Sequence, residues 1–303
     1  MSKGIKIAII AAVCLIGIGL ILGAVGYAAG GSAIFRDEET SERELVISEA
    51  FSDIVIDCER SRVVLLPAED GVCRIEAEES EKCSLSAEVS YGTLNIRQKN
   101  SAKWNIGIFN FNFAAFRAYK LNVYLPQSEY RELSVTNVSG GIEVGKGLVF
   151  LNAKLETVSG GVKLHSAVRS NVSMNSVSGG IEASGFECEI LTANCTSGGI
   201  NLKNIACGTA RIDCTSGGIE LTRVTASGEL RVETVSGGIT FDCCDGGSIH
   251  AEAVSGGIKG SLLSPKRFIT DTVSGKISVP ADGEGGVCEL ETVSGRIEIT
   301  IAE

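Results

Sequence analysis

The sequence predicts an all-β fold. We expect a single-chain parallel β-solenoid, right-handed and with about 19–20 residues per coil, preceded by one N-terminal transmembrane helix. Three observations carry this prediction. A Thr-Val-Ser-Gly-Gly-Ile motif recurs nine times with small variations, at steps of 19 or 20 residues. Apolar and polar residues alternate on both sides of each copy, as they do in a strand with one buried face. An uncharged apolar run opens the chain.

The apolar run predicts a membrane anchor. Residues 1–6 carry two lysines and form a cytoplasmic N-terminus, and residues 7–29 are long and apolar enough to cross a bilayer as a helix. The alternative is a signal peptide cut near residue 28, although such peptides have a shorter apolar region of about 7–15 residues. The spacings Gly19 to Gly23 and Gly26 to Gly30 are those of packed membrane helices, so a homo-oligomer is an open alternative.

Residues 30–44 are interpreted as a linker, and residues 45–132 as degenerate opening β-coils with an aromatic cap. Trp104 to Tyr130 holds eight of the sixteen aromatic residues of the chain, with Phe109, Phe111 and Phe113 in alternation. These side chains either close the open end of the solenoid core or form an exposed patch for a ligand or a lipid surface.

Residues 133–303 are predicted to be the regular coils, and the serine of each motif copy defines position 0. Position +1 is glycine in every copy, which predicts a positive φ or a lack of space for a Cβ atom, whereas Lys276 and Arg296 stand at +2 in the last two copies. The predicted corners are Ser139-Gly140, Ser159-Gly160, Ser178-Gly179, Ser197-Gly198, Ser216-Gly217, Ser236-Gly237, Ser255-Gly256, Ser274-Gly275 and Ser294-Gly295.

The regular coils are expected to follow one another to the end of the sequence. The final strand, from Arg296 to Ile301, would then be an open edge, which is either protected by its charges or available as a docking edge for another chain.

A row of carboxylates is predicted on the outer face, at position −3. Its last five members are Asp213, Glu233, Glu252, Asp271 and Glu291. Carboxylates one coil apart are candidate ligands for a hard cation such as Ca²⁺, but ion pairing with basic residues at −5 explains them at least as well. No cofactor is expected.

Four cysteines form two pairs that are one coil apart: Cys188 with Cys207, and Cys195 with Cys214. Neighbouring coils bring Cα atoms within disulfide range, so each pair is either a disulfide or a ladder of small reduced thiols. No cysteine spacing in the sequence is typical of a zinc site.

The sequence offers little support for catalysis. Arg211, Arg231 and His250 lie beside the −3 carboxylates, but each continues a repeat position, whereas a catalytic site normally interrupts the local pattern. The nine corner serines have no positioned base. A carbohydrate-active enzyme is therefore the third and weakest interpretation.

The chain resembles the bacterial putative-adhesin family of β-strand repeat proteins, a domain of unknown function. Leu121-Asn-Val-Tyr-Leu-Pro, followed by Leu133-Ser-Val-Thr-Asn-Val-Ser-Gly-Gly-Ile, is similar to the entry of that family into its regular coils, and the resemblance extends from about residue 45 to residue 301. It implies the β-solenoid fold and offers no catalytic residues.

These observations lead to a functional expectation. The formal net charge is −10, and −12 without Lys3 and Lys6, which argues against nucleic acid or anionic lipid as partners. We expect a single-pass membrane protein whose C-terminal domain lies outside the cytoplasm and binds an envelope polysaccharide or a protein without catalysis. The alternative is a structural or envelope-stress signalling partner that assembles through the open C-terminal edge or the membrane helix.

Overall fold

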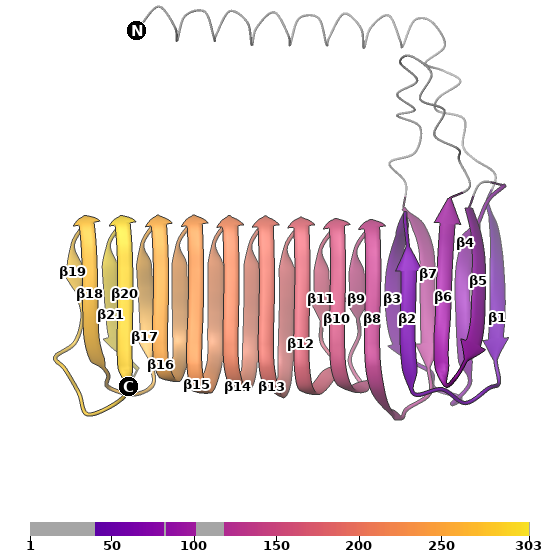
Figure 1. The fold of residues 1–303 in the computed structure, drawn as a ribbon, viewed down its shortest axis with the longest axis horizontal. Helices are drawn as coiled ribbons and strands as arrows, with labels where there is room; N and C mark the ends of the chain where they lie inside the picture. Colours follow the sequence, from indigo (N-terminus) through magenta and orange to yellow (C-terminus); the bar gives the residue numbers. More distant parts are fainter. Residues whose placement is uncertain (1–39, 82, 101–117, 303) are drawn as a thin grey trace, which may run out of the picture. The chain divides into compact units, whose positions relative to one another are not determined.

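A computed structural model describes residues 40–81, 83–100 and 118–302, and these residues form an all-β solenoid without any helix (Figure 1). The predicted all-β parallel solenoid is thereby confirmed for the described part of the chain. The membrane segment expected at residues 7–29, and Phe109, Phe111 and Phe113, lie outside the described residues. A search of the described residues finds no helix with the length and apolarity needed to span a membrane.

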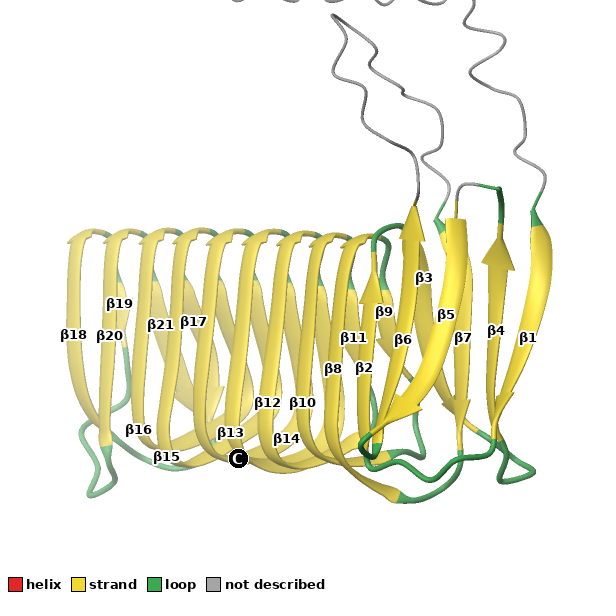
Figure 2. Ribbon diagram, turned by 45° about the vertical axis from the view of Figure 1, so that its right-hand side comes forward, coloured by secondary structure: helices red, strands yellow, loops and turns green. Residues whose placement is uncertain are grey.

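The central strands stack in parallel and in register, so that equal positions of the repeat lie beside one another. Ser139, Ser159 and Ser178 are successive register partners, and the same holds for the following corners as far as Ser255. The central strands are β8 (Glu129–Ser139), β9 (Ile142–Val144), β10 (Val149–Ser159), β11 (Val162–Leu164), β12 (Ala167–Ser178), β13 (Ile181–Ser197), β14 (Ile200–Ser216), β15 (Ile219–Ser236), β16 (Ile239–Ser255) and β17 (Ile258–Leu262). The longest of them run from one corner to the next and make a whole coil (Figure 2).

The core lies between the two sheet faces of the coils and is built from the alternating positions that the sequence predicts. Position −6 is represented by Leu191 and Leu230, position −4 by Ile212, and position +3 by Ile200 and Ile219, all of which are at most 1% exposed. Burial of such aliphatic side chains contributes roughly 1.5–3 kcal/mol each. Each coil therefore adds a layer to one continuous apolar column.

The corner glycines explain why position +1 is invariant in this chain. Seven of them have φ between +126° and +155°, a region that is costly for residues with a Cβ atom. A Cβ atom on Gly217 would lie 2.1 Å from the backbone oxygen of Gly198 on the preceding coil. The amides of eight of the nine corner glycines donate to a serine carbonyl of a neighbouring coil, as from Gly140 to Ser159 at 2.7 Å. Backbone hydrogen bonds thus connect the corners of neighbouring coils.

Position −2 carries small polar side chains that are buried and point into the corner. Thr157 donates to the carbonyl of Gly140 at 3.1 Å, Ser176 donates to Gly160 at 3.0 Å, and Thr234 donates to Gly217 at 3.2 Å. Each donor satisfies a glycine carbonyl of the preceding coil, and the carbonyl of Gly140 also accepts from Nδ2 of Asn137 at 3.0 Å.

A second bend has a regular position that the sequence analysis missed. Gly185, Asn204, Arg223 and Cys243 all stand at position +7, and all have φ between +51° and +79°. Arg223 donates through Nε to Oδ1 of Asn204 on the neighbouring coil at 2.6 Å. Because four different residue types occupy this left-handed position, no motif in the sequence reveals it.

At the C-terminal end the coils do not follow chain order, which corrects one expectation. The strands here are β18 (Arg267–Ser274), β19 (Ile277–Ser278), β20 (Val287–Ser294) and β21 (Ile297–Ile301). β20 pairs with both β16 and β18, and β21 pairs with both β17 and β19, so the last coil is inserted between its two predecessors. The final strand is therefore not an open edge, and β18 and β19 form the edge instead (Figure 1).

The N-terminal end shows a similar insertion. The strands are β1 (Ser41–Ile47), β2 (Asp53–Cys58), β3 (Ser61–Pro67), β4 (Cys73–Glu79), β5 (Cys83–Ser90), β6 (Thr93–Asn100) and β7 (Tyr119–Leu125). β2 and β3 lie between the coil of β8 and β9 and the pair of β6 and β7. β1, β4 and β5 pair antiparallel, so these three strands do not form parallel coils, in contrast to the degenerate opening β-coils expected over residues 45–132.

Candidate functional site

The candidate site lies on the outward face of the sheet that precedes the corners, where positions −5 and −3 form two parallel ladders. The register partners at −3 run in the order Asp213, Glu233, Glu252, Glu291 and Asp271. The structure therefore brings all five predicted carboxylates together, with the last two exchanged by the inserted coil. Neighbouring coils are spaced by about 4.8 Å, so the ladder is a row of like charges at close range.

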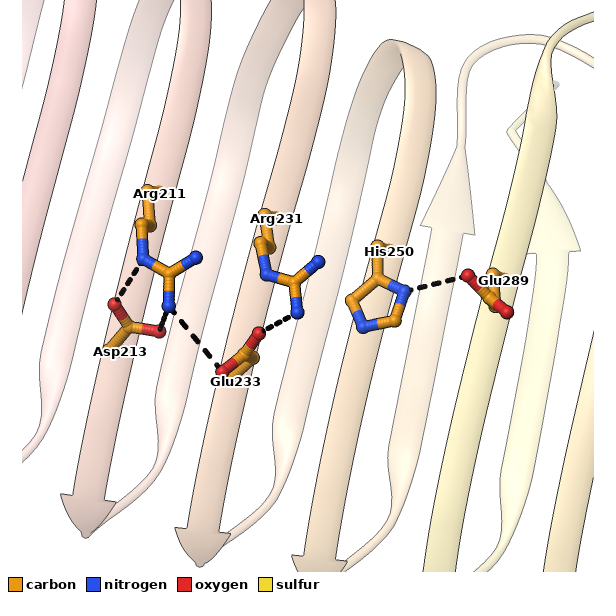
Figure 3. A network of polar contacts seen from close by, with 6 residues as sticks. All are labelled: Arg211, Asp213, Arg231, Glu233, His250 and Glu289. Atoms are coloured by element: carbon orange, nitrogen blue, oxygen red, sulfur yellow. Dashed lines mark hydrogen bonds and ion pairs between the residues drawn. The ribbon is translucent and has the colours of Figure 1, made fainter.

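Two arginines neutralise only one part of this ladder. Arg211 bonds to Asp213 of its own coil at 2.9 Å and lies 3.7 Å from Glu233 of the next coil, and Arg231 pairs with Glu233 (Figure 3). No ion pair within the described part of the chain reaches Glu252 or Glu291. The expected ion pairing thus accounts for the first two carboxylates of the ladder and not for the following ones.

The histidine at −5 has a different partner from the one that the sequence suggests. Nδ1 of His250 lies 2.9 Å from Oε2 of Glu289, its register partner on β20 (Figure 3). If the coils followed chain order, the neighbour of His250 would be Ile269, which also stands at position −5. The inserted coil therefore creates a His–Glu pair that sequence reasoning could not have found.

Burial perturbs the acid chemistry of the ladder. Partial burial raises the pKa of Asp213, the neighbouring Glu233 carboxylate acts in the same direction, and the Arg211 charge only partly opposes them. A carboxylate of this kind is half-shielded from solvent, which strengthens its interactions with a cationic or hydrogen-bonding ligand.

A shallow groove runs beside the ladder across four successive coils. Its volume is about 250 Å³, and it is lined by Asn194, Cys195, Thr196, Asp213, Cys214, Thr215, Glu233, Thr234, Val235, Glu252 and Val254. Its lining combines carboxylate and amide groups with threonine hydroxyls and the exposed side chains of Val235 and Val254. Such a groove combines hydrogen-bond acceptors with apolar contacts along the axis, as an extended ligand requires.

The remaining candidates lie apart from this groove. His165 lies after a corner, where its Nδ1 is 2.9 Å from the Ser184 hydroxyl. Most of the corner serines, among them Ser197 and Ser216, are exposed, and their carbonyls take part in the backbone bonds of the corners.

The cysteine pairs are register partners, as the spacing suggests, and their thiols are free in the structure. Cys195 donates to the carbonyl of Gly179 at 3.1 Å and Cys214 donates to that of Gly198 at 3.2 Å, so both thiols take the part that threonine and serine play at −2 in other coils. Burial raises the pKa of the Cys214 thiol to about 11 and that of Cys188 to about 12. These thiols are poor nucleophiles at neutral pH.

We expect thiol alkylation to distinguish the two interpretations of these cysteines. Among the cysteines of the described residues, only Cys243 is partly exposed, so iodoacetamide at about pH 7.5 should modify it first. Cys195 and Cys214 should react only after unfolding, and then without prior reduction, as peptide mass spectrometry can establish. If they stay unmodified in unfolded, unreduced protein, they form a disulfide.

Comparison with known proteins gives one family and several similar folds. The family model described as Toastrack DUF4097 matches residues 51–268. A putative adhesin from Parabacteroides merdae has a TM-score of 0.50 at 14% sequence identity, covering 86% of this chain and 96% of that chain. A putative adhesin from Bacteroides fragilis has a TM-score of 0.46 at 12% identity, covering 87% of this chain and 98% of that one.

A lipid binding protein from Parabacteroides distasonis, also described as putative, has a TM-score of 0.37 at 15% identity, covering 86% of this chain and 97% of that one. No curated protein sequence matches this chain significantly. At these identities the likeness to the Parabacteroides merdae structure concerns the fold.

Proposed function

This chain belongs to the Toastrack DUF4097 family and is similar in fold to a putative adhesin, and we propose that it is a non-catalytic binding module of the bacterial cell envelope. The groove beside the −3 ladder is its binding surface. The ligand class is an extended envelope polymer, with a polysaccharide as the first choice.

The observation that carries this proposal is the groove itself. It crosses four coils, three of which contribute a carboxylate, at Asp213, Glu233 and Glu252, and its lining also contains threonine and valine side chains. Carboxylates accept hydrogen bonds from sugar hydroxyls, and apolar side chains cover the C–H faces of sugar rings. A ligand of repeating units can therefore make the same pair of contacts at successive coils.

The location of the module follows from the sequence. The apolar segment at residues 7–29 supports a signal anchor with a cytoplasmic N-terminus, and the acidic domain then faces outward from the cell membrane. An anchored module meets its polymer at high local concentration, which compensates for weak contacts in a shallow groove.

The test is co-sedimentation of the full-length protein, solubilised in mild detergent, with cell-wall sacculi of its own host. We expect the parent protein to pellet with the sacculi. The triple variant Asp213→Asn, Glu233→Gln, Glu252→Gln should pellet at least tenfold less, because it loses the carboxylates along the groove. A matched variant, Glu143→Gln, Glu182→Gln, Glu220→Gln, changes the net charge equally on the other face and should pellet like the parent.

If both variants pelleted like the parent, the binding surface would lie elsewhere. If both pelleted less and to the same extent, binding would depend only on net charge. The absence of pelleting by the parent would favour the second candidate function, a structural or envelope-stress signalling partner. One observation supports that candidate: the edge strand β18 is paired on one side only among the described strands, and Ile269 and Val273 are 49% and 79% exposed there. Such an edge can add a strand from another protein.

A further inference from the structure

We propose that Glu233, His250 and Glu252 form a binding site for a divalent transition-metal ion, in which Glu289 orients the histidine without touching the ion. One ligand atom of each of the three residues lies within 4.8 Å of the others, on two neighbouring strands. All three side chains are half-buried. This site does not depend on the proposed function.

The histidine is prepared as a ligand by its hydrogen bond. The ionised Glu289 carboxylate can only accept a hydrogen bond, so Nδ1 of His250 carries the proton. In the neutral imidazole, Nε2 is then the nitrogen with a free lone pair. That atom is buried and has no hydrogen-bond partner among the described residues, and it points away from Glu289 (Figure 3).

A buried ring nitrogen without a partner is unfavourable, and a bound cation removes this cost. The carboxylate–histidine–metal arrangement is the common way in which proteins fix the tautomer and the orientation of a histidine ligand. This second observation sets the site apart from the rest of the acidic ladder.

The local charge also favours a cation. Glu252 has no ion pair among the described residues and is the register partner of Glu291, another carboxylate. Oε1 of Glu233 pairs with Arg231, which lies beside His250 on the neighbouring strand, and Oε2 of Glu233 lies 3.7 Å from Arg211. A divalent ion between Glu233 and Glu252 would relieve the repulsion along the ladder: Oε1 of Glu233 stays with Arg231, and Oε2 exchanges its long contact with Arg211 for the ion.

The donor set indicates the class of ion. One imidazole nitrogen with two carboxylate oxygens suits Zn²⁺, Co²⁺, Mn²⁺ or Ni²⁺, whereas Ca²⁺ needs about six to eight oxygen ligands. Zinc–ligand distances of about 2.0–2.2 Å require the carboxylates to close in by roughly 1 Å, which glutamate rotamers allow. Three protein ligands leave a coordination position open, so a ligand in the adjoining groove can reach the ion.

The experiment is a titration of the full-length protein, freed of metal by a chelator, with ZnCl₂ in a calorimeter and with CoCl₂ in a spectrophotometer. We expect one equivalent of each metal to bind. The Co²⁺ spectrum should show weak bands of nitrogen and oxygen ligands, without the intense near-ultraviolet absorption of a thiolate, since eleven cysteines are present as competing ligands.

Variants then assign the site. His250→Gln should weaken zinc binding at least 100-fold, Glu252→Gln should weaken it similarly, and Glu289→Gln should weaken it about 10–100-fold because the histidine loses its orienting partner. His165→Gln is the matched control, because it removes the other histidine of the chain and should leave binding unchanged. Circular dichroism and thermal unfolding of each metal-free variant verify that it folds.

Three results would overturn the proposal: no zinc binding by the folded parent, unchanged binding by folded His250→Gln, or thiolate bands in the Co²⁺ spectrum. A response to CaCl₂ that equals the response to ZnCl₂ and survives His250→Gln would assign the cation to the carboxylate ladder instead. None of these outcomes affects the sacculus experiment, whose readout is pelleting in the presence of a chelator.

Discussion

Gly217→Ala is expected to destabilise the solenoid by about 3 kcal/mol or more, although it adds only a single methyl group. The new Cβ atom would lie 2.1 Å from the backbone oxygen of Gly198, and φ at this position is +149°. Neither cost can be relieved by a side-chain rotation, because the obstructing atom is backbone that is itself fixed by corner hydrogen bonds. Thermal unfolding should show a decrease in Tm of about 6–12 °C.

The neighbouring glycine provides the control. A Cβ atom on Gly218 would lie 3.6 Å from its nearest neighbour, the backbone oxygen of Gly238, and φ at Gly218 lies outside the left-handed region. Gly218→Ala should therefore leave Tm within about 2 °C of the parent, and Glu220→Gln on the exposed face should do the same. If the two glycine variants unfolded at the same temperature, the steric account of the corner would be wrong.

The amino-acid sequence alone distinguishes these two glycine positions. Lys276 and Arg296 stand at +2, whereas +1 is always glycine, so +1 is the strict position and +2 the permissive one. The period of the motif and the alternation of apolar and polar residues around it likewise predict the coil and its inward-facing positions. They also predict that Asp213, Glu233 and Glu252 lie side by side on neighbouring coils. A local repeat specifies the geometry of a coil, because each coil packs in the same way against its neighbours.

The ends of the solenoid could not be predicted in this way. The period gives the length of a coil but not the order in which coils stack, since β20 fits beside β16 as well as β18 would. The pairing of His250 with Glu289 depends on that order, and so does the proposed metal site. The stacking order of the coils depends on the connecting loops, and the sequences of these loops do not follow the repeat.

Lys266→Met is expected to lower the local stability of the last two coils, because it removes the contacts that hold one such loop in place. Lys266 lies between β17 and β18, is 4% exposed, and places its Nζ 2.6 Å from both Oδ1 of Asp245 and the carbonyl of Gly246. Lys266 thus attaches the segment between β17 and β18 to β16. This attachment lets β20 fit between β16 and β18, and β21 between β17 and β19. Its loss leaves a buried acceptor and a partly buried carboxylate, at a cost of about 2–3 kcal/mol, given that Asp245 keeps some solvent contact.

Hydrogen exchange followed by mass spectrometry is the appropriate measurement, because stability in a solenoid is local. Peptides from residues 263–301 should lose protection by roughly 30–150-fold, which is the equilibrium equivalent of about 2–3 kcal/mol, while peptides from β13 and β14 should not change. Lys259→Met is the matched control, since it makes the same substitution at an exposed position of β17. A uniform loss of protection along the whole chain would contradict a local role of the Lys266 contacts.

The stability that the Lys266–Asp245 ion pair contributes depends on pH in a definite direction. Burial alone would raise the pKa of Asp245, but the hydrogen bonds from Lys266 and Ser264 outweigh it and hold the pKa below its ordinary value. A carboxylate with a lowered pKa in the folded state contributes stability above its unfolded pKa, near about 3.9, and loses it as the pH falls through the folded value. The parent should therefore keep its full advantage over Lys266→Met at about pH 7, and the difference in protection should shrink steadily below about pH 4. A difference that stays constant down to about pH 2 would mean that Lys266 stabilises the crossing through its carbonyl bond and packing alone, and that the ion pair with Asp245 contributes nothing to the order of the coils.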